Sequence, residues 1–262
     1  MANSGFQLSG VIHLCPLPGA PVPAMDFSEV ARRALKDAQT LVDGGITSCV
    51  IENIGDAPFS AGSVDPHVIA MMTRIGAQIR DRFGSSLKIG VNVLRNDARG
   101  ALAVAKACGA EFVRVNVHTG SAWTDQGLIQ GAAHETLKYR RQINAEHIHI
   151  AADVLVKHAV PAGRTNITDI ARDTADRGQA DILIVTGEHT GGETALDDVR
   201  LVKQAVPQRP IWVGSGVNPD NGAAVRDAAD GAIVGSWLHE NGDLSAPLDV
   251  RRVKALVDLL SK

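Results

Sequence analysis

The chain has 262 residues, 45% of them hydrophobic and 3% aromatic, and a formal net charge of -3 at pH 7. This length suits a single α/β barrel of about 250 residues, and a core of aliphatic side chains is typical of parallel sheets. Because lysine and arginine are scattered along the chain, the charge pattern excludes a binding surface for a nucleic-acid backbone.

The sequence contains none of the signals that direct a chain to a membrane. No stretch approaches the roughly 18 apolar residues that a membrane helix requires, and the first residues show no signal-peptide pattern. We therefore expect no transmembrane segment and a cytoplasmic location. The three cysteines, Cys15, Cys49 and Cys108, lie far apart, which favours reduced and mostly buried thiols.

Short β-rich runs alternate with helical patterns along the chain, which predicts a parallel sheet covered by helices. Eight such runs occur, the number that a closed barrel needs. We therefore predict one domain over residues 1–262 with the fold of a closed (β/α)8 TIM barrel. The alternative is an open doubly wound sheet, although no G-x-G-x-x-G turn follows the first run. The predicted strands lie near residues 8–14, 47–52, 87–94, 111–117, 147–154, 181–186, 210–214 and 231–235.

The first three strands end in polar side chains. His13 ends the first strand, and its imidazole could transfer protons near neutral pH. In the next two strands, Ile51 and Val91 must face the covering helices, so the alternation of faces turns Glu52 and Asn92 into the barrel. Both lie at the C-terminal ends of their strands, where barrel enzymes carry out their chemistry.

The fourth and fifth strands place further polar side chains inside the barrel. The inward residues are Arg114 and Asn116 in the fourth strand, and His149 and Asp153 in the fifth. A buried arginine needs a carboxylate partner, which Asp153 or Glu52 would supply. Arg114 and His149 therefore also fit a salt-bridged core, whereas Asn116 and Asp153 are expected at the mouth of the barrel.

Loop residues could join this site. Lys157 could contact a phosphate, act as an acid or form a Schiff base, or it could be a solvated surface lysine. His118, after the fourth strand, is a second candidate for proton transfer. Glu52, Asp153 and His13 come from different strands and could bind a divalent metal ion, so the sequence leaves the need for a cofactor open.

Two loops are long enough to act as lids over a ligand. Residues 118–130 contain glycine and an aromatic side chain, Trp123, that could cover the ligand. Residues 187–194 form the second loop, whose glutamates and histidine could equally be solvated surface groups.

Glycine lines the ends of the seventh and eighth strands. Glycine lets an anion approach backbone N–H groups without a Cβ in the way, and barrels bind phosphate with these two loops. Asn218 as a cap and Pro219 as the first helical residue predict a helix start just beyond the first of them. The predicted phosphate-binding residues are Gly214, Ser215, Gly216, Gly235 and Ser236.

The motifs at the predicted strand ends are more specific to one family than the alternation of strands and helices that all such barrels share. They are Val11–Leu14, Pro16–Gly19, Glu52–Asn53, Asp56–Phe59, Gly90–Asp97, Phe112–Val117, Thr124–Gly127, Ala152–Val154, Lys157–Ala159 and Gly214–Val217. Together they resemble the BtpA family. The resemblance implies the barrel fold and two different roles. The family takes its name from a cyanobacterial factor needed for photosystem I assembly and associated with thylakoid membranes, whereas other members occur near sugar-transport and sugar-phosphate genes.

We predict an enzyme that binds a small phosphorylated carbohydrate or nucleoside-like metabolite and carries out isomerase, epimerase or lyase chemistry. Glu52 and Asp153 would act as general acid and base, while Asn92, Asn116 and Lys157 would orient or polarise the substrate. The alternative is a non-catalytic assembly factor for photosystem I. Because barrels commonly associate through their outer helices, we also expect a homo-oligomer.

Overall fold

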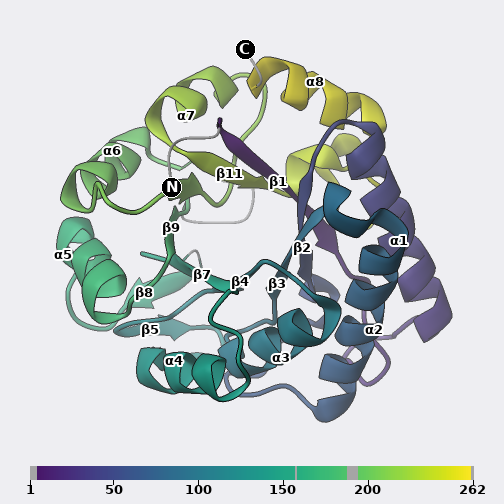
Figure 1. The fold of residues 1–262 in the computed structure, drawn as a ribbon, viewed down its shortest axis with the longest axis horizontal. Helices are drawn as coiled ribbons and strands as arrows, with labels where there is room; N and C mark the ends of the chain where they lie inside the picture. The colour runs from purple at the N-terminus through teal and green to yellow at the C-terminus, as the bar shows by residue number, and fades with distance from the viewer. Residues whose placement is uncertain (1–4, 157, 188–193, 261–262) are drawn as a thin grey trace.

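The predicted strands form a closed parallel barrel in the computed structural model, which describes residues 5–156, 158–187 and 194–260. Pairing of β1 with β11 closes the barrel, and helices surround it (Figure 1). The predicted TIM barrel is confirmed, and closure excludes the open doubly wound sheet. The barrel strands are β1 (Gln7–His13), β2 (Ser48–Glu52), β3 (Lys88–Asn92), β4 (Phe112–Val115), β7 (His149–Asp153), β9 (Ile182–Val185), β10 (Ile211–Val213) and β11 (Gly231–Val234).

The helices follow the strands along the chain. The side chain of Asp26 caps the first of them by accepting a hydrogen bond from the backbone N–H of Ser28. The predicted helix start at Pro219 is wrong, because Asn218 caps a tight turn and the helix begins only at Gly222. No helix in the described ranges is both long and apolar enough to span a membrane. The helices are α1 (Phe27–Asp43), α2 (Pro66–Phe83), α3 (Ala98–Cys108), α4 (Ala133–Gln142), α5 (Ile167–Arg172), α6 (Leu196–Ala205), α7 (Gly222–Ala228) and α8 (Val250–Leu260).

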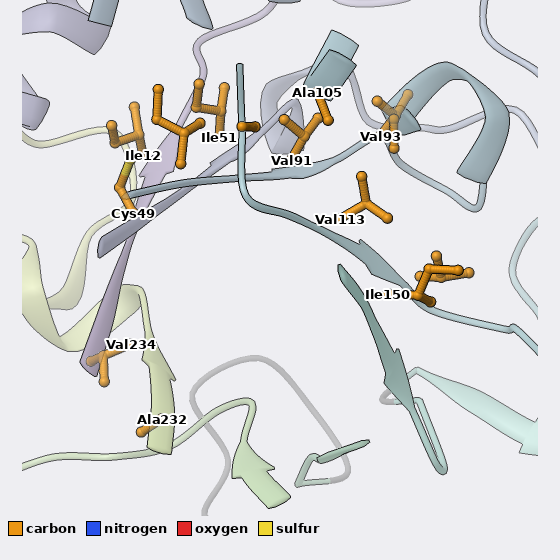
Figure 2. Close-up of a cluster of buried hydrophobic side chains, with 14 of the residues drawn as sticks. Ile12, Cys49, Ile51, Val91, Val93, Ala105, Val113, Ile150, Ala232 and Val234 are labelled. Carbon is orange, nitrogen blue, oxygen red and sulfur yellow. The ribbon is translucent and has the colours of Figure 1, made fainter. Parts of the chain in front are cut away.

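Apolar side chains form two layers, one on each face of the barrel strands. The outer layer packs between strands and helices, and Figure 2 shows Ile51, Val91, Val113 and Ile150 within it. The inner layer fills the barrel interior, where Phe112 and Trp212 meet edge to face with ring centroids 5.5 Å apart. Its members are Val11, Val50, Phe112, Ala151, Ile182, Ile184, Trp212 and Ile233.

The polar strand ends lie directly above the inner layer. His13, Glu52, Arg114 and Asp153 each follow a member of that layer by two residues, and therefore share its face. The expected alternation of faces is thus present in the strands that carry the predicted site. The apolar layer closes the barrel below these side chains and keeps them at its C-terminal mouth.

A second, three-stranded antiparallel sheet lies beside the barrel between α4 and α5 (Figure 1). Its strands, in the spatial order β6-β5-β8, are β5 (Ser121–Thr124), β6 (Gly127–Gln130) and β8 (Ala159–Pro161). The predicted lid at residues 118–130 is therefore mostly a β-hairpin, and Trp123 on it is 55% exposed. In the second predicted lid, residues 188–193 lie outside the described residues.

Candidate active site

His13, Glu52 and Asn92 lie side by side at the ends of three adjacent strands. In register, His13 is next to Glu52 and Glu52 is next to Asn92. Asn92 Nδ2 donates a hydrogen bond of 2.7 Å to Glu52 Oε2, and His13 Nε2 lies 4.0 Å from Glu52 Oε1. Glu52 is only 6% exposed. The first three strands thus bring a buried carboxylate and an imidazole together at the barrel mouth.

A second histidine, His239, orients His13. His239 Nδ1 lies 2.7 Å from the carbonyl oxygen of Ala246, and its Nε2 lies 2.9 Å from His13 Nδ1. Because a carbonyl can only accept, His239 donates from Nδ1 and, when neutral, accepts at Nε2 from His13 Nδ1. The neutral His13 ring therefore carries its lone pair on Nε2, the atom nearest Glu52. Sequence analysis missed His239 because it lies 226 residues from His13 and outside any strand end.

Arg114, Asn116 and Asp153 form a second buried cluster where β4 and β7 end, on the two strands that follow β3 around the barrel. Arg114 donates from Nε and from its terminal nitrogen to the two oxygens of Asp153, both at 3.1 Å, and Asn116 Nδ2 donates to Asp153 Oδ2 at 3.0 Å. Burial acts to lower the pKa of Arg114, but the carboxylates of Asp153 and Glu52 outweigh it and raise the pKa. Asp153 is thus the carboxylate partner predicted for Arg114. The ion pair between them compensates the buried positive charge of the guanidinium.

Arg95 is a further basic group at the mouth that sequence analysis missed. It lies just beyond β3 and is only 5% exposed. Burial lowers the pKa of Arg95, whereas the carboxylates of Asp153 and Glu52 act in the opposite direction. Asp125, in the turn between β5 and β6, also interacts with it electrostatically. Arg95 lies inside the Gly90–Asp97 motif, three residues after the inward strand end at Asn92, and this position could have identified it from the sequence.

Two other histidines lie away from this site. His149 starts β7 with its side chain 48% exposed, so the expectation that it lies deep inside the barrel is wrong. The pKa of His149 is raised because its imidazole donates a hydrogen bond to the carboxylate of Asp181. His118 is buried, with Nε2 2.8 Å from the carbonyl oxygen of Gly178, and burial lowers the pKa of His118. Lys157 lies outside the described residues.

The predicted metal ligands do not form a ligand set. Within the parts of the chain that the structure describes, no group of three or more histidine, cysteine, aspartate or glutamate side chains is placed to hold a metal ion. Asp153 is bound by Arg114 and Asn116, while His13 and Glu52 face each other. The arrangement of these side chains is therefore suited to hydrogen bonding and proton transfer.

The glycines after β10 and β11 are required by close packing or by backbone conformation. A Cβ on Gly214 would lie 2.5 Å from Ile184 Cγ2, and a Cβ on Gly235 would lie 2.7 Å from His13 Cε1. Gly216 has a positive φ of 75°, which glycine adopts without strain. Gly214 and Ser215 are buried, whereas Gly216, Gly235 and Ser236 are partly exposed. The predicted phosphate site remains a prediction, and only its partly exposed half is accessible to a ligand.

A cavity of about 710 Å³ opens beside the second cluster, between the small sheet and α5. Asn116 and Asp153 line its inner end, and Ile167 and Ile170 of α5 line it further out. Of the predicted site residues within the described ranges, Asn116 and Asp153 line this cavity, whereas the β10 and β11 glycines do not. The barrel mouth therefore offers a ligand space outside the predicted phosphate loops.

One known protein family and several known sequences match this chain over nearly its whole length. The model of the BtpA family matches residues 6–262. The photosystem I biogenesis protein BtpA of Synechocystis is 42% identical over 253 residues, which cover 97% of this chain and 87% of that protein. An uncharacterized protein of Pyrococcus furiosus is 44% identical over 250 residues, covering 95% and 93% of the two chains.

Similar solved structures support the fold alone, because their identities are low. KGPDC of Streptococcus mutans has a TM-score of 0.61 at 14% identity and covers 98% of both chains. A KDPGal structure has a TM-score of 0.59 at 16% identity, with 99% of this chain and 96% of that chain covered. N-(5'-phosphoribosyl)anthranilate isomerase of Pyrococcus furiosus has a TM-score of 0.58 at 11% identity and covers 98% of both.

Proposed function

The chain belongs to the BtpA family, and on that premise we propose that it is a TIM-barrel enzyme that acts on a small phosphorylated carbohydrate or nucleoside-like metabolite. The observation that carries this proposal is the buried Glu52–His13 pair at the barrel mouth, oriented by Asn92 and His239. The proposed reaction is an isomerisation, epimerisation or lyase step that moves a proton. One similar barrel is by name an isomerase of a phosphoribosyl compound, which supports this reaction class by analogy of fold.

Glu52 and His13 transfer the proton in this proposal. The 4.0 Å between Glu52 Oε1 and His13 Nε2 leaves the two groups close enough to act on neighbouring atoms of one substrate. One group removes a proton while the other, protonated group donates one, which is general acid–base catalysis. This pairing modifies our prediction that Asp153 is the second acid or base. Both Asp153 oxygens already accept hydrogen bonds from Arg114, so Asp153 is better placed to position that arginine.

The phosphate of the substrate binds at the partly exposed end of the glycine loops. Gly216, Gly235 and Ser236 offer backbone there, and Ser236 begins a short 3-10 helix (Ser236–Leu238) of the kind that completes phosphate sites in other barrels. Lys157 remains a candidate for phosphate contact or Schiff-base chemistry. Bound phosphate would anchor the substrate while its reacting carbon lies against both Glu52 and His13 on their open side.

A ligand screen in deuterium oxide tests the proposal. The wild-type protein is incubated with a panel of sugar phosphates and nucleotides, followed by thermal-shift and proton NMR measurements. We expect at least one compound to raise the melting temperature, since a ligand bound only by the folded state stabilises it, and to exchange a carbon-bound proton with solvent. Glu52→Gln should abolish the exchange and keep the thermal shift. Binding and exchange absent across the whole panel would overturn the enzyme proposal.

The second candidate function is a non-catalytic role in photosystem I biogenesis. The 42% identity to the Synechocystis protein of that name favours it. Complementation of a deletion of that Synechocystis gene with this chain distinguishes the two candidates. Rescue by wild type but not by Glu52→Gln would tie the role to the acid–base site, whereas full rescue by both would favour a site-independent assembly role.

A further inference from the structure

The small antiparallel sheet carries a row of exposed apolar side chains on its outer face. Trp123 of β5 is paired with Leu128 of β6 on one side and with Val160 of β8 on the other. Residues paired across antiparallel strands point to the same face, so these three side chains form one row across the sheet. Leu128 is 40% exposed, Trp123 55% and Val160 66%. In the described part of the chain, the one other large hydrophobic side chain that is exposed is Leu201 on α6.

The opposite face of the same sheet is already covered by this chain. Ala122 of β5 and Ile129 of β6 are buried and cluster with Val117 and Val156, which follow β4 and β7. An antiparallel sheet with one buried face normally presents polar side chains to water on the other. The outer row is therefore not needed to attach the sheet to the barrel, and exposed apolar patches of this kind mark interaction sites.

The charge of this face suits a second copy of the chain. The three strands, Ser121–Thr124, Gly127–Gln130 and Ala159–Pro161, contain no aspartate, glutamate, lysine, arginine or histidine. A two-fold contact brings the same patch of both copies together, so charges near its axis would face their own like. An uncharged face avoids this repulsion, whereas a charged partner would find no group here to pair with. Strand addition at the free edge of β8 is disfavoured, because this strand has only three residues and ends in Pro161.

We propose that the outer face of the small sheet, centred on Trp123, is the contact surface of a two-fold dimer of this chain. Face-to-face packing sets the Trp123 ring of each copy against the aliphatic Leu128 and Val160 of the other, and tryptophan is enriched among the residues that dominate binding energy. The expected homo-oligomer thus forms through the small sheet rather than through the outer helices. Val160 also lines the cavity beside the second cluster, so the contact adjoins that cavity. The dimer does not depend on the chemistry proposed for the barrel mouth.

Sedimentation velocity of the full chain tests whether the dimer forms. A row of three side chains is smaller than the roughly 800 Å² per partner of a standard interface, so we expect a weak dimer with a Kd on the order of 10 μM. The chain should then sediment mainly as a monomer at about 1 μM and mainly as a dimer at about 200 μM. A monomer at both concentrations would overturn the proposal and leave this face to a different partner.

Matched variants locate the contact. Trp123→Ser removes the centre of the row and should raise the Kd of the dimer about tenfold or more. Leu201→Ser removes an exposed side chain on α6, which α5 separates from the small sheet (Figure 1), and should leave the Kd unchanged. Val160→Lys places a charge in the row and is the second variant in case Trp123→Ser does not fold. A folded variant of either residue that dimerises like the wild type would place the contact elsewhere and overturn the proposal.

Discussion

The two sides of the barrel mouth use their buried carboxylates differently. On the β4–β7 side, Asp153 accepts three hydrogen bonds from Arg114 and Asn116. On the β1–β3 side, Glu52 accepts from the neutral amide of Asn92 and faces the imidazole of His13. A carboxylate bound in two places by a guanidinium is held as an ion, whereas one that faces an imidazole can exchange a proton. The comparison indicates a supporting side and a reacting side.

The largest expected effect is on stability and lies on the supporting side. Asp153→Ala leaves the guanidinium of Arg114 buried without its partner, so we expect the free energy of unfolding to fall by about 3–5 kcal/mol in urea denaturation. The exposed pair of Asp197 and Arg200 provides the control, since Asp197→Ala should cost less than about 1 kcal/mol. Equal losses in the two variants would show that the Arg114 ion pair does not support the site.

The next prediction concerns chemistry on the reacting side. Glu52→Gln keeps an acceptor for Asn92 but removes the group that takes up a proton. We expect solvent exchange of a substrate proton to fall about 10²–10⁴-fold, measured by NMR in deuterium oxide, and the free energy of unfolding to fall by less than in Asp153→Ala. A large loss of stability with exchange retained would reverse the assignment of the two sides.

A smaller effect should follow from changing His239, which positions His13. His239→Leu removes the acceptor for His13 Nδ1, so the neutral ring is free to take the other tautomer. Long-range 1H–15N NMR should detect His13 protonated at Nδ1 in the wild type and a shift toward Nε2–H in the variant. We expect the exchange rate to fall about tenfold. His134→Leu, at an exposed histidine, is the control, and an unchanged His13 tautomer in His239→Leu would refute the positioning role.

The polar strand ends on both sides of the mouth were more predictable from sequence than the contacts that orient them. Alternation along each strand places Glu52, Asn92 and Asp153 because a strand has a period of two and the covering helices require apolar partners. The same rule misplaced His149, which faces inward but starts its strand and so lies at the solvent-exposed bottom of the barrel. Alternation specifies a face, and only the position along the strand specifies depth.

Two features that sequence analysis missed, His239 and the β5–β8 pairing, depend on contacts between distant segments. His239 reaches His13 from a loop after the last strand, and no local pattern marks that approach. The pairing of β5 with β8 joins two loops that are separated by α4 and β7, and each strand has only three or four residues. Such short strands carry little periodicity of their own. The strands and the faces of their side chains were therefore predictable, whereas the structure of the mouth required the tertiary contacts.

The smallest expected effect tests whether His118, a histidine on the supporting side, stays unprotonated in the folded chain. Burial lowers the pKa of His118 from 6.5, so the unfolded chain binds a proton there that the folded chain does not, and this contribution destabilises the fold as the pH falls through that value. His149 behaves oppositely, because its raised pKa favours the folded state at low pH and that gain is lost as the pH rises. Urea denaturation at about pH 5.5 and about pH 7.5 should therefore show less acid destabilisation in His118→Gln and more in His149→Gln than in the wild type. If His118→Gln showed the same acid destabilisation as the wild type, the pKa of His118 would not be lowered in the folded chain, and the supporting side would then also hold an exchangeable proton.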